Sequence, residues 1–409
     1  MIAESAASSG AEVVAVDFFG DRDQARLVES YALQRDLGLP LSAAGLGEAS
    51  ERIPAEAVVY GANLENHPDV VAALGRRHAL LGNQPEALGA VRDWRVLRRF
   101  CREAGILHPP TLLPGEEELA TPGCRRLRKR VRSGGGHGIT FWNGESLDDA
   151  HVLQAAIHGR AASAAFVADG RRSVLICLTE QLIGRRELGA SGFRWCGNIL
   201  PLDLSPADHL QLTEQVTRMV SLLTRRFGLR GVNGVDLIVT KGTDGAPVGM
   251  LVEVNPRYCA SMELVEHQYG VNVFSLHLDA FAGRLPEVSP AQMPSQGFLA
   301  KGIIFAREPS TAPSTDDWLD GDIRDVPFAG ERFKTGHPVC TVLAPGNHRR
   351  SCLNALFSRA TAIYTELGGG KENSRERTTH PDHRAHTQAG DRHTQRQELA
   401  GVPRSHRHG

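Results

Sequence analysis

The chain has 409 residues, of which 46 are Lys or Arg, 47 are Asp or Glu and 41% are hydrophobic. A chain of this size can bury more than one core, and its formal net charge of -1 excludes the general positive field that gathers nucleic acid. Its seven cysteines include no Cys-x-x-Cys pair and no apolar run reaches the roughly 18 residues of a membrane span, so we expect a cytoplasmic protein without disulfides, a zinc site or a membrane segment.

Residues 1–88 predict a small α/β domain. Strands and helices alternate here, which is typical of a parallel sheet. The expected elements are a helix over 2–10, a strand at 13–17, a helix over about 21–37, a strand at 57–61 and a helix over about 67–79. A Rossmann-like unit normally begins with a strand and a glycine-rich turn, so we interpret this domain as one whose first strand is missing.

A glycine-rich loop follows a strand that carries a lysine. A helix predicted over 91–104 comes first, and then the stretch 127–139 places Lys129 on a strand before a loop with four glycines in five positions. Glycines let backbone N–H groups close around phosphate oxygens, and Lys129, Arg130 and Arg132 supply opposite charge. The loop does not have the Walker A spacing, and a flexible hairpin tip is the alternative interpretation.

Periodicity, turn residues and capping signals predict the later elements. Ser205 and Pro206 have the pattern of an N-cap and a first helical residue, so a helix should run to about Phe227. The other expected elements are strands of an antiparallel sheet at 152–159, 163–170 and 174–180, a helix over 274–281, a strand at 300–306, an acidic surface loop at 311–325, a strand at 338–344 and a helix over 352–367. Residues 368–409 contain few apolar side chains, so we expect a disordered tail.

Two apolar runs of period two, at 234–239 and 250–257, predict a β-hairpin centred on Asp244-Gly245. If these two residues form the loop, the paired positions on the two arms place Asp236 opposite Glu253. Two facing carboxylates repel each other unless a cation lies between them. The hairpin therefore predicts a metal site, with a solvated acidic face as the alternative.

Two further residues strengthen the metal interpretation. Asn255 shares the face of Glu253 because side chains two apart on a strand point the same way, and its amide oxygen is a third hard ligand that Mg²⁺ accepts. Arg257 adds a permanent positive charge at the end of the strand, where it suits a phosphate or an acyl phosphate.

The order of these motifs resembles the ATP-grasp superfamily of carboxylate–amine ligases. The resemblance covers about 11–367 and rests on a lysine-bearing strand, a glycine-rich loop, a Gln hinge and a hairpin that ends in Glu-x-Asn-Pro-Arg. The phrases at 197–202 and 338–342 are similar to a subgroup found beside one-carbon cofactor genes, of the tyramine–glutamate ligase or pyrrolysine-ligase sort.

The resemblance implies a fold of mixed α/β and α+β character. Two α+β subdomains would clamp ATP, behind a truncated Rossmann-like domain. The implied domains are 1–88 for the Rossmann-like part, 89–285 for the ATP-grasp domain with a lid subdomain at about 108–165, 286–367 for a completing C-terminal region and 368–409 for the tail.

The resemblance also implies roles for particular residues. Lys129 would contact the α and β phosphates of ATP, and Arg257 would stabilise charge on the transferring phosphoryl group and the acyl phosphate. The residues that the resemblance implies for nucleotide binding are Lys129, Ser133, Gly134, Gly135, Gly136, His137, Gly138, Gln154, Ala155 and Ile157. Mg²⁺ or Mn²⁺ would be held by Asp236, Glu253 and Asn255.

The implied reaction joins a small-molecule carboxylate to an amine through an acyl phosphate, and a homodimer is the implied assembly. Two positions depart from the family pattern. Trp94 stands where many members have a nucleotide-binding lysine, for which Arg92, Arg95 or Arg98 would have to substitute, and Ala155 stands where a ribose-binding acid is common. Two alternatives are therefore an ATP-binding protein with impaired catalysis and a phosphotransferase that acts on a hydroxyl group. No motif identifies the substrates.

Overall fold

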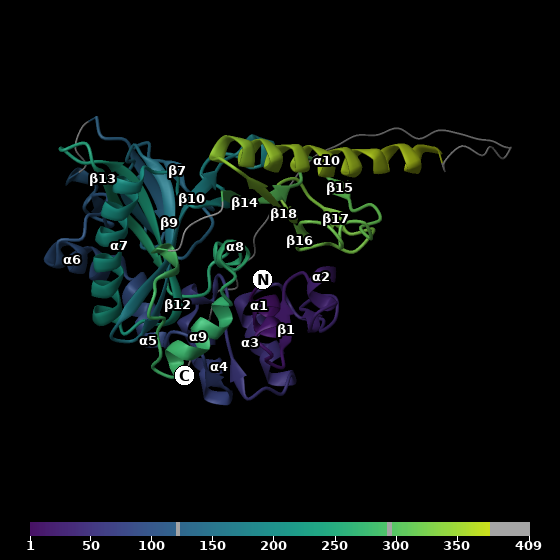
Figure 1. Ribbon diagram of the computed structural model, residues 1–409, viewed down its shortest axis with the longest axis horizontal. Coiled ribbons are helices and arrows are strands. Elements are labelled where there is room, and N and C mark those ends of the chain that lie inside the picture. The colour runs from purple at the N-terminus through teal and green to yellow at the C-terminus, as the bar shows by residue number, and fades with distance from the viewer. Residues whose placement is uncertain (120–122, 293–296, 377–409) are drawn as a thin grey trace, which may run out of the picture. The chain divides into compact units, whose positions relative to one another are not determined.

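The computed structural model describes residues 1–119, 123–292 and 297–376 (Figure 1). The chain divides into one compact unit, Met1–Gly370, and a second, Lys371–Gly409. The first unit contains all the elements described below except the end of α10 (Arg349–Glu376), which extends beyond both ends of the helix predicted over 352–367. From residue 377 onward, the predicted tail lies outside the described residues.

The N-terminal part contains two separate pairs of parallel strands, β1 with β2 and β3 with β4. Its elements are α1 (Ile2–Ser8), β1 (Val14–Asp17), α2 (Arg22–Ala25), β2 (Glu29–Ala32), α3 (Ala43–Arg52), β3 (Ala57–Val58), η1 (Leu64–Asn66), α4 (Pro68–Arg77) and β4 (Ala79–Leu80). The parallel sense of the pairing confirms the prediction, but the strands predicted at 13–17 and 57–61 lie in separate pairs and do not form one small sheet. The helix predicted over 21–37 is wrong, because pairing with β1 draws residues 29–32 into a strand that leads to the fully buried Leu33.

The single helix predicted over 91–104 is two helices, α5 (Pro85–Arg92) and α6 (Trp94–Ala104). Asp93 separates them, because its carboxylate accepts the backbone N–H groups of Arg95 and Val96 and so caps the second helix. This break places Arg92 at the end of one helix and Trp94 at the start of the next.

A small antiparallel sheet follows, with the strand order β5-β8-β6-β7. We call it the lid sheet. Its strands are β5 (Thr111–Leu112), β6 (Arg126–Arg130), β7 (Thr140–Phe141) and β8 (His151–Ala155), with a short helix η2 (Glu117–Leu119) after β5. The predicted strand with Lys129 is therefore confirmed as β6, and the glycine-rich loop connects it to β7.

The main sheet has eight strands in the order β13-β12-β9-β10-β11-β14-β18-β16. The strands are β9 (Arg160–Asp169), β10 (Ser173–Ile183), β11 (Trp195–Leu200), β12 (Arg230–Lys241), β13 (Pro247–Asn255), β14 (Phe298–Phe305), β16 (Ile323–Arg324) and β18 (Pro338–Gly346). A separate two-stranded sheet pairs β15 (Ser310–Thr311) with β17 (Arg332–Phe333). The antiparallel pairing of β9 with β10 confirms the strands predicted from 163 to 180.

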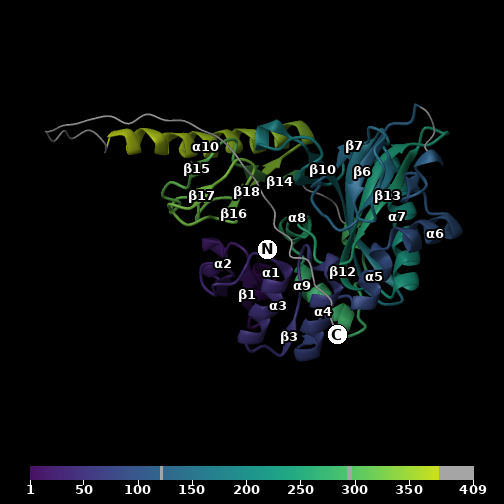
Figure 2. The same ribbon diagram turned by 180° about the vertical axis from the view of Figure 1, so that it is seen from behind.

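Helices cover the main sheet and bury three apolar clusters against it (Figures 1 and 2). The covering helices are α7 (Pro206–Phe227), α8 (Met262–Tyr269), α9 (Val273–Phe281) and α10, with short turns η3 (Arg186–Leu188) and η4 (Pro290–Gln292). The predicted caps of α7 are confirmed, since Ser205 accepts the N–H of Asp208 and Gly228 ends the helix at φ +64°.

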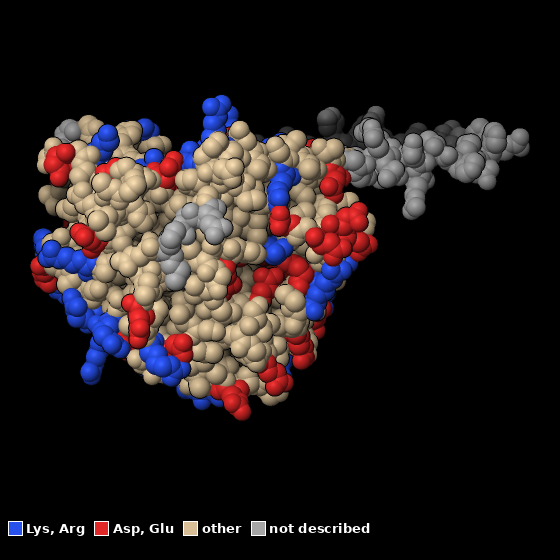
Figure 3. Space-filling view, viewed as in Figure 1, with Lys and Arg blue, Asp and Glu red and all other residues tan. Residues whose placement is uncertain are grey.

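The acidic loop predicted over 311–325 is only partly at the surface. Trp318 is buried in the cluster under α10, and its indole N–H donates to Glu366 at 2.6 Å. Thr315 is fully buried as well. Elsewhere on the molecule, acidic and basic side chains are interspersed over the face shown in Figure 3, in keeping with the near-zero net charge. None of the helices in the described part of the chain is long and apolar enough to cross a membrane.

Two buried side chains join the N-terminal part to the strands of the main sheet. Asn83 donates to the Asn233 side chain at 2.7 Å and to the Pro256 carbonyl at 2.9 Å. His277 accepts the Val232 N–H at 3.1 Å and contacts the Leu81 carbonyl through its other ring nitrogen at 3.0 Å. These contacts fix the N-terminal part beside the end of the β12–β13 hairpin.

This joint should make stability depend on pH. Burial lowers the pKa of His277 from 6.5 to about 4, so between these values the unfolded chain binds a proton that the native chain refuses. The contribution of neutral His277 to the free energy of unfolding is therefore fully present above pH 6.5. It decreases by about 3 kcal/mol as the pH falls to 4. Urea denaturation should show that the stability difference between the wild type and His277→Gln shrinks by this amount from pH 7 to pH 4.

Asn83→Ala provides the control, because it removes hydrogen bonds from the same joint but no titratable group, so its stability difference should not change over the same range. A constant difference for His277→Gln would show that His277 does not titrate as its buried position requires.

Candidate active site

The site is organised by the β12–β13 hairpin, in which Asp236 pairs directly with Glu253 as predicted. The two-residue loop is wrong, since the loop spans 242–246. The register at the acidic pair still holds because Val252 has no partner in the ladder and forms a bulge, which shifts the pairing by one residue between the acidic pair and the loop. The backbone thus sets two carboxyl groups side by side on one face of the sheet.

The two carboxyl groups differ in their affinity for a proton. Burial and the neighbouring Glu253 raise the pKa of Asp236 to about 8, while the side-chain amide of Gln181 donates to its Oδ1 at 3.0 Å. Burial also favours the neutral form of Glu253, but the charges of Arg92 and Lys129 outweigh it and lower the pKa of this carboxyl. The pair is therefore disfavoured from carrying two negative charges at once, and a cation bound there would offset that repulsion.

Arg257 lies at the end of β13 and is fixed by residues on both sides. Its Nε donates to Oε1 of Glu65 at 3.1 Å, and its Nη2 donates to Oδ1 of Asn255 at 3.2 Å. Glu65 belongs to η1 in the N-terminal part and is only 2% exposed. Because a bound arginine loses little further entropy on meeting an anion, this pair holds Arg257 ready for a charged ligand. Sequence reasoning missed Glu65, since an isolated acid in a loop carries no signal.

Lys129 projects from β6 of the lid sheet toward the acidic hairpin, and its charge interacts with both Glu253 and Asp236. It is 7% exposed, and its Nζ donates to Oε1 of Gln154 at 3.1 Å. Burial lowers the pKa of Lys129, and the indole ring of Trp94 lies 5.7 Å from the ammonium group. Trp94 therefore occupies space beside the lysine and does not replace the charge that the family pattern would place there.

The other predicted hinge residues have clear positions. The backbone N–H of Ala155 donates to Pro110 at 2.8 Å and that of Ala156 to Arg125 at 2.9 Å, so both amides are used within the lid sheet and its edge. Ile157 is partly buried in the connection from β8 to β9. Gln154 contacts Lys129, so its position suits the orientation of this lysine better than direct contact with a base.

The glycine-rich loop, Ser133–Gly138, forms a flap with three glycines at positive φ. Gly135, Gly136 and Gly138 have φ values of +61°, +76° and +71°. A Cβ atom on Gly136 would lie 1.9 Å from the carbonyl oxygen of Phe193, so only glycine fits there. The flap is also held by the N–H of Trp195, which donates to the Gly135 carbonyl at 3.0 Å.

Arg92 connects the flap to the acidic hairpin. Its Nη1 contacts Oε2 of Glu253 at 3.5 Å, and its Nη2 donates to the Ser133 carbonyl and to Oδ1 of Asn66, each at 3.0 Å. The sequence indicated Arg92 only as one of three candidates for a missing positive charge. Of the other two, Arg98 forms an ion pair with Glu116 and Arg95 is exposed.

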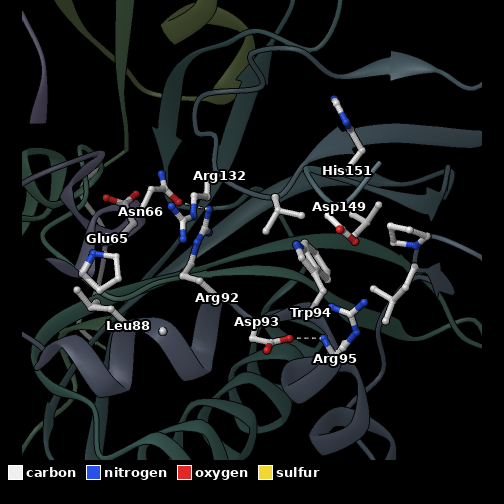
Figure 4. Close-up of a pocket in the computed structure, with 16 residues that line it drawn as sticks. Glu65, Asn66, Leu88, Arg92, Asp93, Trp94, Arg95, Arg132, Asp149 and His151 are labelled. Carbon is white, nitrogen blue, oxygen red and sulfur yellow. Dashed lines mark hydrogen bonds between the residues drawn. The ribbon is translucent and has the colours of Figure 1, made fainter. Parts of the chain in front are cut away.

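A cavity of about 330 Å³ opens beside these residues (Figure 4). Arg92, Trp94 and Arg95 line it, and Figure 4 shows Arg132, the residue before the flap, on the same side as Glu65. His137 lies at the outer side of the flap, where burial and Arg194 lower the pKa of its ring. The cavity thus lies between the N-terminal part, the start of α6 and residues in and next to the strands of the lid sheet.

The donor atoms of the site suit a divalent cation that also keeps ligands from outside the protein, such as water and phosphate oxygens. Within the described residues, no three His, Cys, Asp or Glu side chains converge as a complete metal site. Asp236 and Glu253 contribute two carboxylates, and Asn255 adds an amide oxygen next to them. Mg²⁺ is commonly held by one or two carboxylates together with phosphate oxygens and water, so this donor set fits a cation that arrives with a phosphate ligand.

A lid sheet that carries Lys129 and the glycine-rich flap therefore faces an acidic hairpin of the main sheet. Residues 94–261 match the profile of the family described as "ATP-grasp domain", which covers the lid sheet and the hairpin. No protein among those with curated annotation matches the chain in sequence. The chain therefore has the ATP-grasp fold predicted from its motifs, whereas the subgroup suggested by residues 197–202 and 338–342 is still a prediction.

Solved structures with the same fold cover most of the chain. The biotin carboxylase domain of Hydrogenobacter thermophilus 2-oxoglutarate carboxylase, bound to MgADP, ADP and bicarbonate, is 15% identical with a TM-score of 0.65, over 86% of this chain and 85% of that one. Campylobacter jejuni biotin carboxylase is 14% identical with a TM-score of 0.65, over 90% and 88% of the two chains. Thermotoga maritima N5-carboxyaminoimidazole ribonucleotide synthetase is 13% identical with a TM-score of 0.60, over 88% and 95%. At these identities the likeness establishes the fold alone.

The flap conformation can be tested with two glycines. Gly136→Ala should lower local stability by about 1–3 kcal/mol, because its backbone conformation and its contact with Phe193 both exclude a side chain. Hydrogen exchange of the flap amides should become faster. Gly134→Ala is the matched control, since a Cβ atom there meets nothing within 4 Å. Equal exchange rates in the two variants would contradict the assigned conformation of the flap.

Proposed function

We propose that this chain is an ATP-dependent ligase that uses Mg²⁺ or Mn²⁺ and joins a small carboxylate to an amine, with release of ADP and phosphate. The observation that carries the proposal is the convergence of Lys129, Arg257 and the Asp236–Glu253 pair on one region from separate elements. The MgADP bound in the H. thermophilus structure supports the choice of nucleotide and metal.

The chain's own residues would divide the binding of ATP between them. Asp236, Glu253 and Asn255 would hold the divalent cation, which supplies positive charge to the phosphate oxygens when bound. Lys129 would contact the α and β phosphates, and the residues of the flap, Ser133–Gly138, would close over them with their backbone amides. Ile157 and Ala155, two residues before it, would border the base.

Arg257 would act on the substrate carboxylate. A carboxylate is a poor electrophile, so one of its oxygens attacks the γ phosphorus of ATP, ADP leaves, and an acyl phosphate forms. The amine then attacks the acyl carbon, phosphate leaves with the C–O bond electrons, and the amine loses a proton. The guanidinium of Arg257, fixed by Glu65 and Asn255, would stabilise the charge that develops on the phosphoryl and acyl oxygens.

The flap would exclude water from this reaction. An acyl phosphate hydrolyses if water reaches it, so a closed site protects the intermediate until the amine arrives. Arg92 contacts both Glu253 and the Ser133 carbonyl, and so it would hold the flap toward the hairpin. We also propose that the chain forms a homodimer and works in the cytoplasm. The identity of the acid and the amine depends on loop side chains for which there is no motif.

Glu253→Gln tests the metal interpretation. This change removes one negative charge from the pair, so release of phosphate from ATP should fall by about 100-fold or more. The melting temperature without nucleotide should shift by no more than about 3 °C, because a neutral amide fills the same space. Asp244→Asn makes the same charge change in the loop of the same hairpin and should leave both quantities unaltered. If Glu253→Gln unfolds the protein instead, Glu253 has a structural role.

The reaction class is decided by the product. Purified protein given ATP, Mg²⁺ and a panel of acids and amines should release phosphate and form an amide, identified by mass spectrometry. A phosphoester in place of an amide would indicate a phosphotransferase. Tight ATP binding by calorimetry without any turnover would indicate a nucleotide-binding protein without catalysis. Trp94 beside Lys129 is the reason to consider this alternative.

A further inference from the structure

A second hollow, of about 360 Å³, lies apart from the acidic hairpin and is lined by three arginines. We call it the arginine hollow. Its lining is Arg186, Gly189, Ala190, Ser191, Arg194, Ala306, Arg307, Thr335 and Gly336. These residues come from three separate segments of the chain, and none of them is acidic. The lining thus offers guanidinium groups, two hydroxyls and glycine backbone to a ligand.

Two of the arginines are held in place by the surrounding structure. Arg194 lies over the ring of Phe305 at 4.7 Å and donates to the Gly336 carbonyl at 2.7 Å. Arg307 lies over the ring of Tyr364 at 3.8 Å and donates to the carbonyl of Arg186 at 3.2 Å. Stacked and hydrogen-bonded guanidinium groups lose little freedom when they meet an anion.

The three arginines of the hollow, Arg186, Arg194 and Arg307, form no ion pair among the described residues. The neighbouring Glu187 is paired with Arg185. Three like charges around one space repel each other, and an anion placed between them would relieve that repulsion. Gly189 is held there by internal packing, since a Cβ atom on it would lie 2.2 Å from the carbonyl oxygen of Phe305.

The hollow shares a loop with the flap of the candidate active site. Arg194 lines the hollow, while the residues on either side of it contact the flap. The carbonyl of Phe193 packs against Gly136, and the N–H of Trp195 donates to Gly135. The charge of Arg194 also acts on the His137 ring. A ligand bound to Arg194 would therefore add a further contact to the segment on which the flap rests and would oppose its displacement.

We propose that the arginine hollow binds a small dianion carrying phosphate or carboxylate groups, and that its occupation steadies the flap. A nucleotide is disfavoured because the aromatic faces beside the hollow, Phe305 and Tyr364, are already covered by Arg194 and Arg307 and cannot stack on a base. Arginine forks match the oxygens of phosphate and carboxylate groups in pairs. The proposal stands independently of the ligase reaction.

Isothermal titration calorimetry of the full chain tests the binding, with inorganic phosphate and succinate as separate probes and chloride at matched ionic strength as the blank. Saturable binding of either dianion supports the proposal. Binding of phosphate or of succinate then shows whether the natural ligand carries phosphate or carboxylate groups. Arg186→Gln and Arg307→Lys should each weaken binding by about tenfold or more, since each loses charge-assisted hydrogen bonds. Arg102→Gln removes an exposed arginine from α6 and should leave the affinity unchanged. Absence of binding by both probes overturns the proposal.

Lys129→Gln separates this hollow from the candidate active site. If the dianion binds in the arginine hollow, this variant binds it as the wild type does, whether or not the chain is a ligase. Loss of binding in Lys129→Gln with full binding in Arg186→Gln would place the anion at the hairpin and overturn the proposal. Hydrogen exchange at 134–138 should slow when the hollow is occupied, and unchanged exchange at saturation would overturn the link to the flap.

Discussion

The site depends on the repulsion between two carboxyl groups that the backbone forces together. The β12–β13 register sets Asp236 beside Glu253, and burial makes their charges costly. Two positive side chains offset this cost. Arg92 comes from the end of α5 and Lys129 from the lid sheet. These cations are therefore drawn to the hairpin by its charge, and the lid, the flap and the hairpin share one electrostatic centre. A divalent cation would take over part of that role and release positive side chains toward a phosphate ligand.

The N-terminal part contributes directly to this centre. Glu65 fixes Arg257, Asn66 accepts from Arg92, and Asn83 binds both β12 and the end of β13. Its two pairs of short strands are mostly only partly buried, and these polar contacts and His277 hold it beside the hairpin. The part that the sequence marks as a separate domain is thus also a wall of the site.

The sequence predicted those parts of the site that local patterns encode. Alternation and a turn signal placed Asp236 opposite Glu253, but that register holds only because an unpredicted bulge at Val252 offsets the longer loop. Capping residues were enough to define α7. The same reasoning predicted a helix over 21–37, because periodicity alone cannot reveal that residues 29–32 pair with β1. It also missed Glu65 and Gln181, which lie far along the chain from the groups they contact. Such partners are chosen by the tertiary fold, and no spacing in the sequence records them.

The position of Trp94 follows from the same balance of charge. Lys129 is buried with its ammonium bonded to Gln154, and a second lysine at position 94 would add another buried positive charge within reach of it. The indole offers its electron-rich face to Lys129 instead and costs no desolvation of a charge. Arg92, two residues earlier, supplies a positive charge next to Glu253, where a negative group compensates it. The break between α5 and α6 at Asp93 allows the positive charge to lie at position 92 and the neutral indole at position 94. Arg92 contacts the hairpin, and Trp94 lies beside Lys129 of the lid sheet.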